Sequence, residues 1–389
     1  MTKLRGIAWQ HTRGYLPMVA TAQRFRELHP DVEIHWEVRS LQAFADQPIA
    51  DLAQRFDLLM IDHPFCGRAA RGDVLLPLDE FIEPAFLDDQ KRNQVGGSYD
   101  SYWYGSHLWA LPVDTATPVS GARVELMKKN GVQKPQRWSD VLEIARSGKV
   151  VVPAIAIDSL MNFYMLCIAL GEEPFREEGG VVSPEVGSRA LEMLRELVCL
   201  CDWRCLERNP IATWELMSSS DDALYCPFAY GYSNYAREGY ARSPIEFGGL
   251  VTTDGGVPLR SVLGGAGLSI ALSTEQQEIA VEYAVFAASP TVQRGIYFES
   301  GGQPGHRTAW TDAEVNRRSN GFFERTLQTL DEAYVRPRFD GYLRFQDEAG
   351  FVVHRYLAQG GASRTVLNAL NVLLRKSLKE METRNNETP

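Results

Sequence analysis

The sequence predicts an α/β protein of two lobes, each built on a mainly parallel sheet flanked by helices. Its 389 residues exceed the length that one hydrophobic core usually organises. Strand-length apolar runs alternate with helical patterns through the first sixty residues, an order that predicts a parallel, right-handed sheet. Two extended segments, 109–119 and 261–272, are expected to cross between the lobes and form a hinge beside a central cleft.

The first lobe is expected to begin with strands at 4–9, 29–39 and 56–61, and with helices at 17–28 and 44–56. Pro17 opens the first helix in this interpretation, because proline is favoured in a first helical turn. The run Phe56–Ile61 reads as a buried parallel strand that stops at Asp62 and His63. Ligands bind at the carboxyl ends of strands in open α/β sheets, so these two residues are expected at the cleft.

A short helix at 67–72 and a proline-broken apolar segment follow the strand at 56–61. The second lobe is expected to contain a helix at 135–145, a strand at 150–158, helices at about 160–170 and 184–200, and a strand with a polar exit at 223–236. The helix at about 274–288 follows the return crossing and is expected in the first lobe. The predicted boundaries are 1–113 plus about 262–312 for the first lobe and 114–261 for the second. C-terminal helices at 313–389 are expected to pack on the lobes.

Composition excludes several classes of partner. A hydrophobic content of 44% with 23% charged residues is typical of a globular protein. The net charge of −10 argues against nucleic acid and anionic membranes, which need clustered positive charge. No window approaches the roughly 18 consecutive apolar residues of a membrane span, so no membrane insertion is expected.

The beginning of the sequence and the cysteines bear on location. No apolar segment or small-residue cleavage site precedes the first strand, which predicts a cytoplasmic protein as the sequence stands. A periplasmic or extracellular location is expected instead if a signal peptide has been removed. The cysteines are expected to be reduced thiols; they are Cys66, Cys167, Cys199, Cys201, Cys205 and Cys226.

Several motifs occur in an order that resembles the extracellular solute-binding proteins of carbohydrate ABC transporters. They are FDLLMIDHP, VLLPLDEF, YGSHLWALPVDTATPV, PQRWSDVLEIA, LGGAGLSIA and SPTVQRGIYFESGGQPGHRTAW, and the resemblance covers roughly residues 4–312. It implies a type 2 periplasmic-binding-protein fold, in which two α/β lobes close on a ligand about a hinge. It also implies an ABC transporter permease as a partner.

The resemblance assigns ligand contacts to positions that follow the strands and crossings. They are Trp9, His11, Arg39, Asp62, His63, Asp114, Tyr230, Tyr232, Asn234, Gly264, Gly265 and Arg307. Arg13 and Tyr15 join them from the exit loop of the first strand. The glycines are expected to let the backbone approach a ligand closely.

Two ligand chemistries remain open. Trp9, Trp103 or Trp109, with Tyr230 and Tyr232, could stack on sugar rings while Asp62, Asp114 and Asn234 take the hydroxyls. Core packing is the alternative for each aromatic ring. Arg13, Arg39 and His63 would instead suit an acidic sugar or a small carboxylate, because arginine grips a carboxylate with two hydrogen bonds.

The interpretation that we favour is a monomeric solute-binding protein that captures a small polar ligand without chemistry. The alternative is a cytoplasmic enzyme or ligand sensor, in which His63 acts as a base and Cys66 as a nucleophile beside Asp62. The sequence CLCDWRC at 199–205 lacks the second ligand pair of a zinc site, so no metal is expected. The glycine motifs fit no nucleotide site, and no cofactor is expected.

Overall fold

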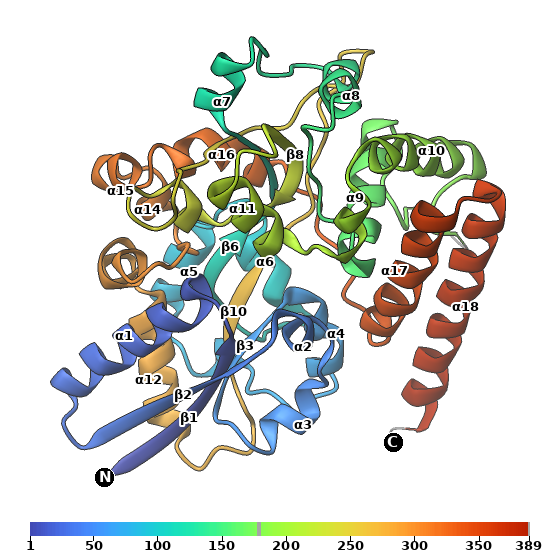
Figure 1. The fold of residues 1–389 in the computed structure, drawn as a ribbon. Coiled ribbons are helices and arrows are strands. Elements are labelled where there is room, and N and C mark those ends of the chain that lie inside the picture. The colour runs from blue at the N-terminus through green and yellow to red at the C-terminus, as the bar shows by residue number, and fades with distance from the viewer. Residues whose placement is uncertain (177–179, 388–389) are drawn as a thin grey trace. The chain divides into compact units, whose positions relative to one another are not determined.

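The computed structural model describes residues 1–176 and 180–387. The chain divides into two compact units (Figure 1). Unit 1 comprises Met1–Ala116, Leu263–Ser319 and Arg338–Asp340, and unit 2 comprises Thr117–Val262, Asn320–Pro337 and Gly341–Pro389. Each unit is therefore assembled from segments that are far apart in the sequence.

Unit 1 is organised around a five-stranded mixed sheet of order β2-β1-β3-β10-β6. Its strands are β1 (Thr2–Trp9), β2 (Val32–Arg39), β3 (Leu58–Ile61), β6 (Leu111–Ala116) and β10 (Gly264–Ile270). The first three pair in parallel, as predicted, and β10 runs antiparallel to β3 and β6. The glycine-rich return segment is therefore an internal strand of this sheet, between β3 and β6.

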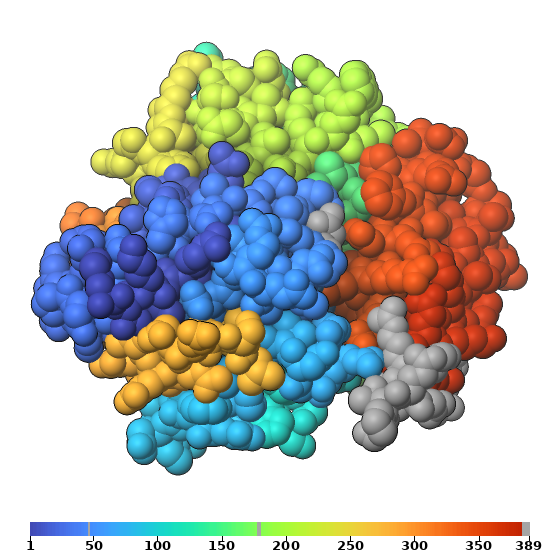
Figure 2. Space-filling view, turned by 90° about the horizontal axis from the view of Figure 1, so that it is seen from below, coloured from blue at the N-terminus to red at the C-terminus, as the bar shows by residue number. Residues whose placement is uncertain are grey.

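Helices cover both faces of the sheet in unit 1. All four residues of β3 are 0% exposed, as expected for a central strand buried on both sides. Helices α1 (Thr12–Leu28) and α12 (Gln277–Ala288) pack on each other and on the sheet, while α2 (Leu41–Asp46) and α3 (Ile49–Ala53) contact β1 and β3. In Figure 2 the orange segment around α12 lies between the blue N-terminal segments and the lighter blue chain around α5 (Pro84–Arg92).

Three helix predictions in unit 1 need correction. Helix α1 begins at Thr12 rather than at Pro17, because His11 caps its N-terminus and Pro17 is tolerated inside the helix. The helix predicted at 44–56 is two short helices, α2 and α3, since Pro48 between them cannot donate a helical hydrogen bond. The helix predicted at 67–72 is α4 (Cys66–Ala69), which begins one residue earlier and ends three residues earlier.

The sheet of unit 2 is antiparallel, so the prediction of a mainly parallel second sheet is wrong. Its strands are β7 (Pro118–Ala122), β8 (Tyr225–Tyr230) and β9 (Glu246–Gly248), in the order β8-β7-β9. Both neighbours pair antiparallel with β7. A short run of buried residues looks the same in the sequence whether its strand pairs in parallel or antiparallel. The pairing direction of this sheet could therefore not be predicted from the apolar runs.

The strand predicted at 150–158 is also wrong. Val150 makes one isolated bridge to Tyr225, and the chain turns into helix α9 (Ala156–Ala169) with Asp158 in its first turn. The β-branched residues at 150–152 favoured a strand for the whole segment, but only its first half is extended. The other main helices of unit 2 are α8 (Trp138–Arg146), α10 (Pro184–Leu200), α11 (Pro210–Ser219), α16 (Phe322–Asp331), α17 (Tyr342–Gln359) and α18 (Ser363–Glu387).

Helix α17 packs closely on α9 and beside α18 within unit 2. A Cβ atom at Gly350 would lie 2.8 Å from the carbonyl oxygen of Ala156, so this glycine permits the close approach of α17 to α9. None of the described helices combines the length and apolar character that a membrane crossing needs.

The remaining elements are short. In unit 1 they are η1 (His63–Phe65), η2 (Leu78–Glu80), α6 (Ser98–Tyr102), β4 (Trp103–Tyr104), β5 (His107–Leu108), α13 (Pro290–Val292), η5 (Gln293–Tyr297), α14 (Arg307–Trp310) and α15 (Ala313–Arg318). In unit 2 they are α7 (Val124–Lys129), η3 (Trp203–Glu207) and η4 (Ser233–Ala236).

Candidate functional site

The strands β1, β2 and β3 end at one edge of the sheet in unit 1. Trp9 is in register with Arg39, and Ile7 is in register with Leu59, so the three carboxyl ends lie side by side. Seven of the predicted ligand residues stand at this edge, and we call them the carboxyl-end cluster: Trp9, His11, Arg13, Tyr15, Arg39, Asp62 and His63. Parallel strands with aligned ends are the arrangement that builds ligand sites in α/β proteins.

His11 has a structural task and a defined protonation state. Its Nδ1 accepts a hydrogen bond from the backbone N–H of Arg13 at 3.0 Å and so caps α1. Burial, reinforced by the charge of Arg13, lowers the pKa of His11 to about 4. The ring is therefore neutral at physiological pH, and Nε2 carries its proton. Tyr15 follows one turn later and is half-buried.

Arg13 and Asp114 bind each other inside unit 1. The Nε of Arg13 donates to Oδ2 of Asp114 at 2.8 Å, and Nη2 pairs with Oδ1, which makes the contact two-pronged. The side chains are 4% and 0% exposed. Burial raises the pKa of the Asp114 carboxyl, and the guanidinium of Arg13 opposes that rise. Two residues predicted as separate ligand contacts thus form one buried ion pair.

The packing of Trp9 leaves little of its ring exposed. The side chain is 3% exposed and lies 5.1 Å from the ring of Phe44, between centroids. The guanidinium of Arg13 lies 5.8 Å from the Trp9 ring centroid. A Cβ atom at Gly14 would come within 2.3 Å of the same ring, so the glycine allows the helix to seat on it.

Arg39 holds the edge of the sheet together. Its Nη2 donates to the carbonyl oxygen of Met60 at 2.8 Å, and Nη1 donates to that of Ala43 at 3.3 Å. Its guanidinium also lies over the ring of Phe44, 5.3 Å from the centroid. This side chain therefore links the end of β2 to β3 and α2.

Asp62 and His63 begin the turn that follows β3. Oδ1 of Asp62 accepts a hydrogen bond from the backbone N–H of His63 at 2.8 Å and lies 3.1 Å from Nδ1 of the same histidine. His63 is 1% exposed, and its ring meets the edge of Tyr102, 6.4 Å away between centroids. The sequence did not single out Tyr102 from its aromatic loop, although its hydroxyl donates to the carbonyl of Ile61 at 3.2 Å.

Cys66 is not prepared to act as a nucleophile. The thiol is fully buried and contacts the carbonyl oxygens of Ser101 and Tyr102 at 3.8 and 3.7 Å. Burial raises its pKa strongly, so the reactive thiolate is scarce at neutral pH. This weakens the enzyme alternative, which used Cys66 beside His63.

The two glycines predicted at the return crossing begin β10. Gly264 pairs with Ala116 and Gly265 with Thr115. Gly265 has φ of +119°, and a Cβ atom there would lie 2.4 Å from the carbonyl oxygen of Asp114. The glycine thus serves close strand pairing beside the ion pair.

Arg307 begins α14 and donates hydrogen bonds to the backbone after α5. Its Nε donates to the carbonyl of Gln94 at 2.9 Å, and its backbone N–H donates to that of Asn93 at 2.7 Å. These bonds join the segment after the Gly-Gly-Gln-Pro turn to the end of α5.

The predicted residues of unit 2 follow β8. Tyr230 is half-buried, and its carbonyl accepts from the indole N–H of Trp214 at 2.7 Å. Tyr232 and Asn234 are 3% and 1% exposed. Their neighbour Tyr235 donates its hydroxyl to Glu215 at 2.9 Å, and the sequence offered no sign of Glu215 or Trp214 at this place.

All six cysteines are free thiols. Across residues 1–176 and 180–387, no group of three or more His, Cys, Asp or Glu side chains could hold a metal ion, the cluster at 199–205 included.

Comparison with known proteins decides the family. The model of the bacterial extracellular solute-binding protein family matches residues 8–294. The chain belongs to this family. The search of curated proteins found no match to this solute-binding protein.

Solved structures match the chain over nearly its whole length. A T. maritima MalE3 with bound maltose is 18% identical, with a TM-score of 0.81 over 98% of this chain and 100% of that one. An ABC transporter solute-binding protein of Agrobacterium radiobacter in complex with ribitol is 15% identical, with a TM-score of 0.82 over 95% and 97%. One of Thermotoga lettingae with α-D-tagatose is 16% identical, with a TM-score of 0.82 over 96% and 100%. These likenesses establish the periplasmic-binding-protein fold.

Proposed function

We propose that this solute-binding protein captures a neutral sugar or polyol for an ABC transporter, and that the carboxyl-end cluster provides the ligand contacts of unit 1. The observation that carries the choice of a neutral ligand is the buried ion pair between Arg13 and Asp114. Asp114 neutralises Arg13, and Arg39 donates to two backbone carbonyls. The arginines that could have gripped a carboxylate are therefore engaged within the protein.

The remaining polar groups of the cluster suit hydroxyls. The neutral ring of His11 presents an N–H donor at Nε2, and the Asp62 carboxylate supplies acceptors. Carboxylates and imidazoles give directional hydrogen bonds to sugar hydroxyls. The solved structures with maltose, ribitol and tagatose support the same chemistry.

For unit 2 we propose that Tyr230, Tyr232 and Asn234 are the ligand contacts, with the tyrosine rings as stacking surfaces. The permease of an ABC transporter is the proposed partner, and the extracellular character of the family supports a location outside the cytoplasm.

The test is chemical unfolding of the full chain with maltose, ribitol, D-mannitol or tagatose, and with gluconate and glucuronate as acidic counterparts. A ligand at 100 times its dissociation constant should add about 2.7 kcal/mol to the free energy of unfolding. We expect this from at least one neutral compound. A shift produced only by the acids would overturn the proposal.

The placement of the site is tested by substitution. Asp62→Asn and His11→Gln should each make the binding free energy of the sugar less favourable by more than about 1 kcal/mol, as measured by titration calorimetry. The control is Asp73→Asn, an exposed aspartate of unit 1 that pairs with Arg68. Equal affinity in all three variants would remove the carboxyl-end cluster from the site.

A further inference from the structure

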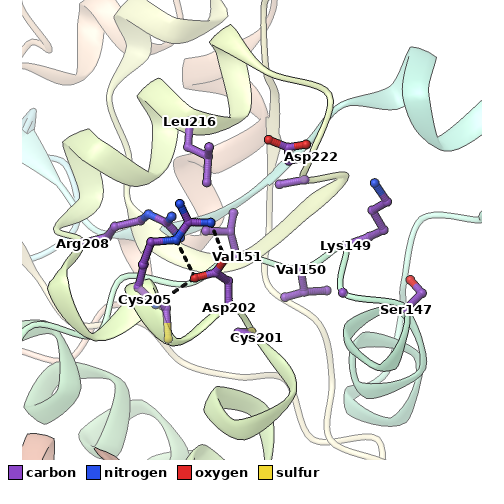
Figure 3. A pocket seen from close by; sticks show the side chains of 13 residues that line it. Ser147, Lys149, Val150, Val151, Cys201, Asp202, Cys205, Arg208, Leu216 and Asp222 are labelled. Atoms are coloured by element: carbon purple, nitrogen blue, oxygen red, sulfur yellow. Dashed lines mark hydrogen bonds and ion pairs between the residues drawn. The ribbon is translucent and has the colours of Figure 1, made fainter.

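Unit 2 contains a cavity of about 390 Å³ whose lining includes none of the predicted ligand residues (Figure 3). It lies between the chain after α8, the segment after α10, one residue of α11, and the loop before β8. Its charged lining residues are Lys149, Asp202, Arg204, Arg208 and Asp222. The volume is in the range of sites for small metabolites.

The charges around this cavity do not cancel. Asp202 forms an ion pair with Arg204, whose guanidinium donates hydrogen bonds to the two carboxylate oxygens at 2.9 and 2.6 Å. Arg208 and Lys149 are half-buried, and neither side chain has a hydrogen bond or ion pair within the part of the chain that the structure describes. The remaining carboxylate, Asp222, is exposed to solvent, where its charge is screened. Two partly buried cations are thus left in a chain whose net charge is −10.

The rest of the wall adds no negative charge. Burial raises the pKa of Cys201 and, to about 11, that of Cys205, so both thiols are neutral at physiological pH. Val150, Val151 and Leu216 are apolar.

We propose that this cavity binds a small organic anion with at least two charged groups, carboxylate or phosphate. Figure 3 shows Arg208 and Lys149 on opposite sides of the cavity, so one ligand would meet both only if it carries charge at both ends. Arg208 offers a planar guanidinium that holds a carboxylate or phosphate with two hydrogen bonds. Lys149 supplies a point charge for the second group.

The two cations could also serve the fold alone. Helices α8 and α10 both end at the cavity, and the carbonyl groups of a helix C-terminus attract positive charge. That role predicts that replacing Arg208 or Lys149 changes stability without changing the response to anions. The experiment therefore measures both.

The experiment is titration calorimetry of the full chain with citrate, with inorganic phosphate and with acetate, at constant ionic strength adjusted with sodium chloride. We expect citrate to bind at least tenfold more tightly than acetate. Arg208→Gln and Lys149→Gln should each lower the affinity for citrate at least fivefold. The control Arg189→Gln removes an equal charge from an exposed position of α10 and should leave binding unchanged.

Arg208→Lys keeps the charge but not the two-pronged contact, and it should recover part of the affinity. Far-UV circular dichroism and chemical unfolding check that each variant is folded. Equal affinity for citrate and acetate would overturn the proposal, as would wild-type citrate affinity in Arg208→Gln. Sugar binding is measured in the same variants and should be unchanged, so the failure of this site is distinguishable from a failure of the proposed sugar site.

Discussion

At the scale of single residues, the ion pair of Arg13 and Asp114 makes a sharp prediction. Both side chains are almost fully buried. Removing one partner leaves the other as an uncompensated buried charge, which typically costs about 3–5 kcal/mol. Asp114→Ala and Arg13→Met should therefore each lower the free energy of unfolding by about that amount in urea titrations.

The double variant Arg13→Met/Asp114→Leu distinguishes this explanation from a simple loss of contacts. It removes both charges and fills the space with apolar atoms, so it should be less destabilised than either single variant. If the loss of unfolding free energy in the double variant equals the sum of the losses in the two single variants, the two charges are not energetically coupled and the explanation is wrong.

A second residue-scale prediction concerns Asp158 in unit 2. Its carboxyl is 4% exposed, and Oδ2 is a buried oxygen with no hydrogen-bond partner among the described residues. Burial raises its pKa from 3.8 to about 8, so the folded protein keeps the proton while the unfolded chain ionises. Stability is therefore fully present below pH 3.8 and is lost as pH rises towards 8.

Asp158→Asn removes this titration. Relative to the variant, the wild type should lose up to about 1.4 kcal/mol for each pH unit within that window. Urea unfolding at pH 5, 6, 7 and 8 measures the difference. A constant difference between the two proteins across this range would show that Asp158 is already ionised in the folded state.

All seven residues of the carboxyl-end cluster were expected near strand ends, because a strand end is visible in the sequence as an apolar run that stops. The sequence could not show that Arg13 and Asp114 would bind each other, since 101 residues separate them and no local pattern links them. Nor could it show that Arg39 donates to the carbonyl of Met60, since Met60 lies 21 residues further along the chain on β3, a strand that does not pair with β2.

At the scale of elements, Gly265 controls how β10 meets β6. Its φ of +119° strains any other residue, and an added Cβ atom would lie 2.4 Å from the backbone oxygen of Asp114. Gly265→Ala should lower the free energy of unfolding by more than about 2 kcal/mol, because strain and a backbone clash act together.

Gly256→Ala is the matched control. Gly256 has φ of +81°, and nothing lies within 4 Å of an added Cβ atom. This variant experiences conformational strain alone and should lose only about 1 kcal/mol. Equal losses in both variants would show that the contact with Asp114 relaxes without cost.

The elements of unit 1 were predictable where one local signal dominates. The strands β1, β2 and β3 follow from apolar runs, whereas the division between α2 and α3 depends on Pro48 and was missed. In unit 2, the prediction of a strand at 150–158 failed. The β-branched residues of this segment indicate a strand, whereas burial of α9 against α10 and α17 favours a helix from Ala156. Packing overrode local propensity there.

At the scale of the whole molecule, unit 1 cannot be cut out as one continuous piece. Strand β10 lies between β3 and β6 in the sheet, although it follows β6 only after residues 117–263. A fragment of residues 1–116 should therefore lack a cooperative unfolding transition, because its sheet has lost a central strand.

A rejoined unit 1 provides the comparison. Ala116 and Gly264 are antiparallel partners, so replacing residues 117–263 with Asn-Gly connects them through a two-residue hairpin turn. The chain 1–116, Asn-Gly, 264–319 should unfold cooperatively in urea, followed by circular dichroism. Cooperative unfolding of the 1–116 fragment alone would contradict the requirement for β10.

The interleaved order of strands has a consequence for how the protein is made. During translation β1, β2, β3 and β6 are synthesised early. Strand β10, which pairs with both β3 and β6, is complete only when residue 270 has been translated. Until then the nascent chain carries two unpaired strand edges, which other chains could join. A polypeptide that completes its first sheet so late stays incompletely folded for most of its synthesis, the state to which chaperones bind.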